Sequence, residues 1–188
     1  MKTYEGHDLF HYEDFPFDYS ISDCLHYAFG DLLSNTTRGA VAEFIVAKAL
    51  DLNTDFPRRD WESYDLLYNG KRIEVKASSY LQSWNIDNDR ISKISFSIRR
   101  AGEYNAESGK YSEKQHNSDI YIFCVLTESD WVKLDVSDLS QWRFYAVPTR
   151  LIDSVCGNQS SISLSSLLKN FSPVELTYYS LKSAVDNL

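Results

Sequence analysis

Cysteine is scarce in this sequence, and long hydrophobic runs are missing. The three cysteines, Cys24, Cys124 and Cys156, are odd in number and far apart. This argues against a disulfide framework or a zinc site and predicts reduced thiols in a cytoplasmic protein. No segment approaches the roughly 20 apolar residues of a membrane span, and the first residues lack the apolar stretch of a signal peptide. We therefore expect no membrane partner.

Several motifs are also absent. The sequence has no internal repeat, no heptad pattern, no glycine loop that would cradle a phosphate and no nucleophile elbow. These absences argue against repeat proteins, coiled coils, P-loop enzymes and α/β-hydrolases. The 188 residues, 43% hydrophobic and 14% aromatic, instead suit one globular domain with a sizeable core, spanning residues 1–188.

Positive charge is in short supply overall. The net charge of −8 argues against a protein that coats nucleic acid through bulk attraction. Residues 1–31, however, carry seven acids against Lys2, a net charge of −6, so the remainder carries only −2. Within that remainder, Arg90, Lys93, Arg99 and Arg100 fall in one stretch without an acid, which leaves room for a local basic face.

The most informative stretch of the chain is residues 63–76. Asn69-Gly70 lies between two runs of strand-forming residues, and this pair predicts a two-residue type I′ hairpin turn because both positions need positive φ. Counting outward predicts four facing pairs: Tyr68 with Lys71, Leu67 with Arg72, Leu66 with Ile73, and Asp65 with Glu74.

The last of these pairs places two acids opposite each other. Like charges that face each other destabilise a sheet unless something positive lies between them, and a divalent cation is the simplest candidate. Side chains alternate along a strand, so Ile73 and Val75 point to one face while Glu74 and Lys76 point to the other. Two carboxylates and a nearby lysine suit metal-assisted phosphodiester hydrolysis. The alternative is a solvated strand face with a cross-strand ion pair.

The arrangement of Asp65 followed by Glu74-Val75-Lys76 on the next strand resembles the PD-(D/E)XK nuclease superfamily, which has the restriction-endonuclease-like fold. The resemblance implies that Asp65, Glu74 and the Val75 carbonyl bind Mg²⁺, with Mn²⁺ as a possible substitute. It also implies that Lys76 positions the attacking water or helps to deprotonate it. One departure is that Tyr64, not proline, precedes Asp65.

A helix is predicted over residues 35–50, with Asn35 or a neighbouring threonine as its N-cap. Glu43 falls on its small and apolar stripe, and the resemblance implies that Glu43 reaches a metal or its waters. The alternative is that Glu43 pairs with an arginine such as Arg38. Arg38, in the first turn, is also a candidate for phosphate contact, and Gly39 would allow close approach of another backbone.

Other candidate residues follow the hairpin. By the resemblance, Gln82 lines the active site, and Ser78 and Gln82 orient water or DNA. Trp84 either stacks on a base or packs inside the protein. Arg99 and Arg100 are candidates for substrate binding within the basic stretch.

The rest of the sequence predicts an α/β fold with a central mixed sheet of about five to six strands flanked by helices. Strands are expected over residues 94–98, 119–126, 131–136 and 142–147, and helices over 20–33, 148–155 and 163–170. Residues 101–118 form a long polar connection, in which only 112–117 could make a short helix. We expect either a degenerate crossover helix or a mobile flap over the substrate.

Two parts of the chain differ in character. Residues 1–33 form an acidic, aromatic, helical segment that either packs on the core or makes the surface of a possible homodimer, and residues 34–188 form the core and the C-terminal helices. From the hairpin and the resemblance we expect a Mg²⁺-dependent DNA endonuclease of restriction or DNA-processing type. The alternative is an inactive nuclease-fold module that binds DNA or a protein partner.

Overall fold

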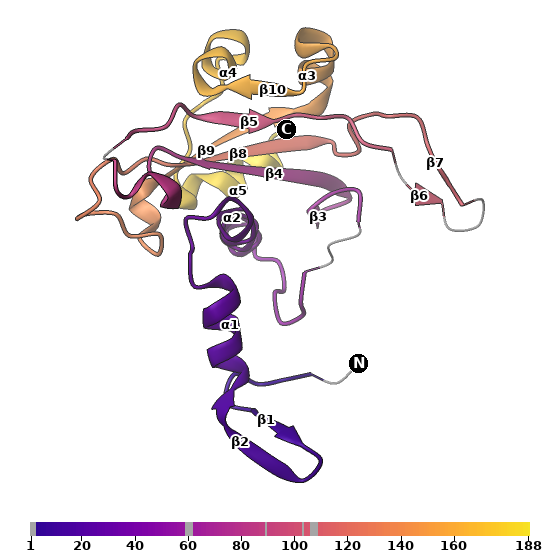
Figure 1. The fold of residues 1–188 in the computed structure, drawn as a ribbon. Helices are drawn as coiled ribbons and strands as arrows, with labels where there is room; N and C mark the ends of the chain where they lie inside the picture. Colours follow the sequence, from indigo (N-terminus) through magenta and orange to yellow (C-terminus); the bar gives the residue numbers. More distant parts are fainter. Residues whose placement is uncertain (1–2, 59–61, 89, 103, 106–108) are drawn as a thin grey trace.

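A mixed four-stranded sheet forms the centre of the computed structural model, which describes residues 3–58, 62–88, 90–102, 104–105 and 109–188 (Figure 1). The strands lie in the order β3-β4-β8-β9, and they are β3 (Leu66–Tyr68), β4 (Lys71–Ser79), β8 (Ile120–Leu126) and β9 (Trp142–Pro148). The pairs β3/β4 and β8/β9 are antiparallel and β4/β8 is parallel. The predicted α/β class and mixed sheet are confirmed. The predicted size of five to six strands is wrong for the described residues.

The sheet separates two hydrophobic layers (Figure 1). The helices α2 (Asn35–Ala49) and α5 (Tyr178–Asp186) cover one face, and β5 (Ser95–Ser97), β10 (Ser161–Ser163), α3 (Thr149–Cys156) and α4 (Leu164–Phe171) cover the other. Strand β8 is buried along its whole length. It sends Ile122 and Cys124 into the first layer and Phe123 and Val125 into the second, which explains its near-continuous apolar sequence.

The hairpin β3–β4 forms as the sequence predicts. Asn69 and Gly70 have φ of 49° and 78°, and the three pairs from Tyr68↔Lys71 to Leu66↔Ile73 have the predicted register. The Tyr68 hydroxyl donates a hydrogen bond of 2.7 Å to Asp186 Oδ1. The hairpin is thereby tied to α5, a helix that we did not predict.

Helix α2 begins at Asn35, close to the prediction, but its cap is a different residue. The Ser34 side chain accepts the amide of Thr37 at 3.2 Å, so Ser34 is the N-cap and Asn35 the first helical residue. The expected close approach of a backbone at Gly39 is wrong, because a Cβ at this position would have no heavy atom within 4 Å.

Two predicted strands do not join the central sheet. Residues 131–136 form turns, because the Asp130 and Asp135 carboxylates accept the amides of Val132 and Ser137 and such local bonds compete with strand pairing. Strand β5, predicted over 94–98, pairs with β10 and not with the central sheet. The count of four strands follows from these two differences.

The connection between the parallel strands β4 and β8 contains no α-helix among its described residues. It includes the 3₁₀ turn η1 (Ser83–Asn85), β5, and the short antiparallel pair β6 (Tyr104–Asn105) and β7 (Lys110–Tyr111). This pair projects from the body (Figure 1). The short helix suggested over residues 112–117 is absent.

The N-terminal segment projects from the side of the body that carries α2 (Figure 1). It consists of the hairpin β1 (Leu9–Tyr12) and β2 (Phe15–Ser20), followed by α1 (Ile21–Phe29). The predicted helix is confirmed over 21–29, and the Ser20 hydroxyl caps it in a capping box with Asp23. The expected packing of this segment on the core is wrong, because no side chain from residue 3 to residue 32 is buried and Leu33 is the first to pack against the core.

The remaining features agree with the sequence. Helices α3 and α4 lie where they were predicted, with Ser163 capping α4, and a 3₁₀ turn η2 (Leu139–Gln141) precedes β9. All three cysteines are free, as expected. Within the described residues, no helix has both the length and the apolar character needed to cross a membrane.

Two glycine substitutions test the turn. Gly70→Ala should lower the free energy of unfolding by about 1 kcal/mol, because alanine is strained at the positive φ of Gly70 although a Cβ would meet no atom there. Gly39→Ala, equally open but helical, should raise it by about 0.5–1 kcal/mol. Urea denaturation measures both, and equal effects of the two changes would contradict the turn assignment.

Candidate active site

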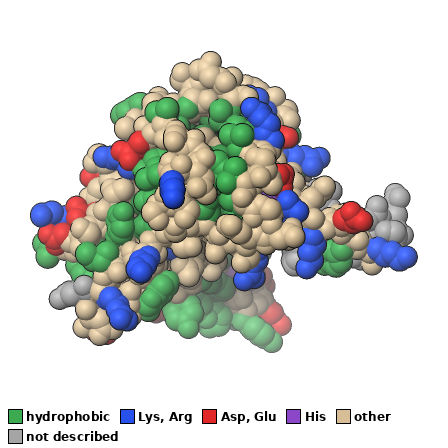
Figure 2. Space-filling model, turned by 90° about the horizontal axis from the view of Figure 1, so that it is seen from above, with side chains coloured by type: hydrophobic (Ala, Val, Ile, Leu, Met, Phe, Trp, Pro, Cys, Tyr) green, Lys and Arg blue, Asp and Glu red, His purple; other side chains and the backbone are tan. Residues whose placement is uncertain are grey.

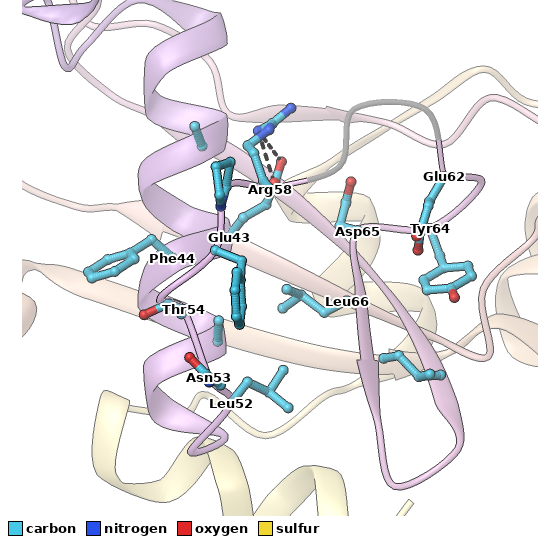
Figure 3. Close-up of a pocket in the computed structure, with 15 residues that line it drawn as sticks. Glu43, Phe44, Leu52, Asn53, Thr54, Arg58, Glu62, Tyr64, Asp65 and Leu66 are labelled. Carbon is cyan, nitrogen blue, oxygen red and sulfur yellow. Dashed lines mark hydrogen bonds and ion pairs between the residues drawn. The ribbon is translucent and has the colours of Figure 1, made fainter. Parts of the chain in front are cut away.

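A pocket of about 540 Å³ opens between α2, residues 52–58 and the start of β3 (Figure 3). Its wall combines exposed apolar side chains, including Phe44 and Phe56, with the carboxylates of Glu43 and Asp65 and the guanidinium of Arg58. The described lining residues are Ala40, Glu43, Phe44, Ala47, Leu52, Asn53, Thr54, Phe56, Pro57, Arg58, Glu62, Tyr64, Asp65, Leu66 and Leu67. Two of the predicted site residues thus share one cavity.

Asp65 lies immediately before β3, where regular pairing with β4 ends. Its amide donates to the Ile73 carbonyl at 3.0 Å, and its Oδ2 accepts the Val75 amide at 2.7 Å. The regular pairs end at Leu66↔Ile73, so the side chain of Asp65 reaches across to the backbone of β4 in place of a further ladder pair. This hydrogen bond fixes the position of its carboxylate.

Glu74 and Lys76 lie on the same face of β4, as predicted, and form an ion pair with each other. Both side chains are largely buried, with 19% and 28% of their surface exposed. Burial raises the pKa of Glu74, Lys76 opposes this shift, and the charge of Asp65 adds to it. Burial alone would lower the pKa of Lys76, but the charges of Glu74, Asp65 and Glu43 raise it above its ordinary value.

Glu43 projects from α2 into the pocket (Figure 3). Arg58 Nη1 donates to both of its carboxylate oxygens, at 3.0 and 2.9 Å. Burial raises the pKa of Glu43 from 4.5 to about 7, and the negative charges of Asp65 and Glu74 contribute while Arg58 and Lys76 act against it. Glu43 therefore pairs with an arginine, as the alternative expected, but its partner is Arg58 and not Arg38.

These four side chains act on one another electrostatically although they come from three separate elements. The charges of Asp65, Glu74 and Lys76 all shift the pKa of Glu43, and the charges of Asp65, Glu74 and Glu43 all shift that of Lys76. The structure therefore brings three carboxylates and an ammonium, with Arg58, close enough to the β3–β4 hairpin to influence one another's charge. Three partly buried carboxylates repel one another, which favours protonation or cation binding.

The donor chemistry of this cluster fits a hard cation such as Mg²⁺, which prefers carboxylate oxygens. Its geometry is not yet that of a metal site, because the described residues contain no group of three or more His, Cys, Asp or Glu side chains arranged to hold an ion. Arg58 and Lys76 neutralise Glu43 and Glu74 instead. A bound cation would take over this role from the two basic side chains.

Arg38 and Gln82, two further predicted residues, are buried and contact each other. Arg38 Nη1 donates to Gln82 Oε1 at 2.8 Å and to the Leu33 carbonyl at 2.7 Å. Gln82 Nε2 donates to the Ser79 carbonyl at 2.7 Å. The pair links the start of α2 to the end of β4, and it orients the two elements that carry Glu43 and Lys76.

The other predicted substrate-binding residues lie apart from the pocket. Ser78 is buried in β4, Trp84 is exposed in η1, and Arg99 is exposed just after β5. Arg100 is bound to Asp153 and Asn158. Seen from above, Lys and Arg side chains are scattered among apolar and uncharged ones and do not form one basic patch (Figure 2).

Sequence reasoning missed several residues that line the pocket. Arg58, Phe44 and Phe56 come from α2 and from the irregular segment after it. A buried glutamate needs a cation nearby, and the linker before the hairpin contains Arg58 and Arg59, but the sequence does not indicate which of them reaches Glu43. The aromatic rings gave no signal of their own, because most aromatic side chains in a sequence belong to the core.

The comparison with protein families gives one match. The family model described as bacteriophage T4 endonuclease IV matches residues 17–166, which include α2, the β3–β4 hairpin and all four site residues. Curated proteins show no match to this chain. The match spans most of the sequence, so the chain belongs to the bacteriophage T4 endonuclease IV family and is thereby a nuclease of the endonuclease type that acts on DNA.

Proposed function

We propose that this endonuclease is a Mg²⁺-dependent enzyme of the PD-(D/E)XK type, acting in the cytoplasm in restriction or DNA processing. The observation that supports this most is that Glu43 and Asp65 line one pocket and that their charges, together with that of Glu74, raise the pKa of Lys76. Asp65 followed by Glu74-Val75-Lys76 on the next strand also supports the proposal, because this order resembles the superfamily.

Asp65 and Glu74, with the Val75 carbonyl, would hold the cation, and Glu43 would complete the ligand set. Mn²⁺ is a plausible substitute because it takes the same oxygen ligands. When bound, the cation supplies Lewis-acid stabilisation of the charge that develops on the phosphate and lowers the pKa of water.

Lys76 and Glu43 have different proton-transfer capacities. The raised pKa of Lys76 keeps its ammonium protonated, so Lys76 acts as a hydrogen-bond donor to the attacking water or a phosphate oxygen. Of its two suggested roles, this favours positioning over deprotonation. Glu43, with a pKa of about 7, is suited to accept a proton near neutral pH.

Arg58 would exchange its partner Glu43 for a phosphate of the substrate. Its side chain is half exposed, whereas that of Glu43 is 16% exposed. A DNA phosphate offers Arg58 an equivalent anionic partner, so its arrival would release Glu43 for the cation. In this proposal substrate and cation bind cooperatively.

The rival proposal is a nuclease fold that binds DNA or a protein without cleaving. One observation favours it: Glu43 and Glu74 are already neutralised by basic partners, and no ligand trio is assembled in the described residues. Metal binding and cleavage distinguish the two proposals.

Cleavage should depend on Asp65 and Lys76. Asp65→Asn keeps an oxygen to accept the Val75 amide but removes the charge, and Lys76→Met keeps the length of the side chain. Each should reduce cleavage of plasmid and single-stranded DNA by about 1,000-fold or more, with little change in melting temperature. The matched control is Asp119→Asn, because Asp119 also accepts a β4 amide, that of Arg72, at 2.8 Å but lies outside the pocket. Wild-type cleavage by either site variant would contradict the mechanism.

Metal binding is measured independently of cleavage. Mg²⁺ or Mn²⁺ at 100 times its dissociation constant should stabilise the folded protein by about 2–3 kcal/mol, seen as a rise in melting temperature after EDTA treatment. Asp65→Asn should abolish the rise and Asp119→Asn should keep it. A protein with neither a thermal shift nor cleavage would support the non-cleaving alternative.

The titration of Glu43 predicts a pH dependence of stability in EDTA. Its folded-state pKa of about 7 lies above the ordinary 4.5, so the folded state holds the proton more tightly, and stability falls as pH rises through this window. Between pH 5 and pH 8 this group should lower the free energy of unfolding by about 1–3 kcal/mol. The Glu43→Gln variant should lack this contribution when its free energy of unfolding is measured by urea denaturation at each pH. An identical pH profile of stability in both proteins would contradict the assignment.

A further inference from the structure

Phe56, in the irregular segment after α2, is a large apolar side chain that stays uncovered beside the charged cluster. It lines the same pocket as Glu43 and Asp65 and is 77% exposed. It belongs to neither hydrophobic layer of the core, so core packing does not account for its position. Phe44, the other phenylalanine of the pocket, is 54% exposed and also lies outside both layers. The pocket therefore offers aromatic surface to the molecule that enters it.

The neighbours of Phe56 in the sequence hold it near the acids. Pro57 follows it and restricts its backbone to extended conformations. Arg58 comes next and donates to both carboxylate oxygens of Glu43, at 3.0 and 2.9 Å (Figure 3). This ion pair ties the segment that carries Phe56 to α2, so an aromatic side chain lies beside carboxylates without being buried.

The charges of the pocket narrow the choice of occupant. Glu43, Glu62 and Asp65 are acids among its described lining residues, so a phosphate is disfavoured there except at a bound cation or at Arg58. An uncharged planar group suits the exposed rings. The same cavity holds acids of the proposed cleavage site, and the family acts on DNA. The part of DNA that is both planar and uncharged is a nucleobase, which stacks readily on aromatic side chains.

The size and the surroundings of the pocket agree with this occupant. Its volume of about 540 Å³ lies within the range of roughly 300–1,000 Å³ that is typical of ligand pockets. Lys48 follows Phe44 by one turn of α2, and its Nζ lies 5.6 Å from the centroid of the Phe44 ring. A neighbouring phosphate of the same strand would find a cation there.

We propose that Phe56 stacks on the nucleobase next to the cleaved phosphate, with Phe44 extending the apolar wall, and that this contact helps to determine where the enzyme cuts. The inference rests on the proposed function, because the cleaved phosphate is placed at Glu43 and Asp65. A base can meet a ring in this way only when it lies outside the helical stack. The contact therefore selects positions at which a base is free to turn outward.

Binding without cleavage tests the contact. In EDTA, fluorescence anisotropy with a labelled single-stranded oligonucleotide should give a dissociation constant about 10-fold or more higher for Phe56→Ala than for the wild type. The melting temperature should not change, because the ring lies outside the core. Phe56→Tyr keeps an aromatic ring and should bind as the wild type does. The matched control is Tyr179→Ala, which removes a ring that is 92% exposed in α5 and should leave binding unchanged.

A cleavage assay then locates the base. A single abasic nucleotide is placed in turn on each side of the mapped cut in a single-stranded oligonucleotide. With Mg²⁺, the wild type should lose about 10-fold or more in cleavage rate at one position. Phe56→Ala should show no further loss there, because both changes remove the same contact. If the metal mechanism fails, no oligonucleotide is cleaved, whereas the difference in binding in EDTA remains.

Three outcomes would overturn the inference. The first is equal binding by the wild type and Phe56→Ala, and the second is binding by Phe56→Tyr that is as weak as that of Phe56→Ala. The third is a loss of cleavage at the abasic position that has the same size in the wild type and in Phe56→Ala.

Discussion

The crowding of like charges beside the β3–β4 hairpin is the constraint on which the site depends. Asp65 is held by the Val75 amide, Glu74 is fixed in β4, and Glu43 enters from α2. Together they are tolerable only because Arg58 and Lys76 lie among them. The protein therefore keeps three partly buried carboxylates next to two basic side chains. Natural sequences maintain such an arrangement more readily for function than for stability.

The rest of the fold serves to hold that balance in place. The hairpin is joined to α5 by Tyr68, the start of α2 is joined to the end of β4 by Arg38 and Gln82, and β8 supplies side chains to both hydrophobic layers. The elements that carry the charged groups are thus fixed from several sides. The N-terminal segment and the β6–β7 pair lie outside this framework (Figure 1).

The parts of the structure set by local chemistry were predictable from sequence. Asn69-Gly70 specified the turn, and the turn fixed the register of β3 and β4. The strand predicted over residues 131–136 is wrong because their alternation is typical of a strand, whereas Asp130 and Asp135 accept local backbone hydrogen bonds. The ion pair between Arg58 and Glu43 could not be predicted, because it depends on the path of an irregular segment. The hydrogen bond from the Val75 amide to Asp65 could not be predicted either.

The contact between Tyr68 and Asp186 joins residues 118 positions apart. During synthesis the pairing of β3 with β4 can form as soon as both strands emerge, because these pairs are close in sequence, whereas α5 is made much later. Contacts between such distant parts of a chain form late in folding. The first layer of the core therefore closes only after α5 has been made, so a nascent chain carries the whole set of charged residues well before it carries a rigid site.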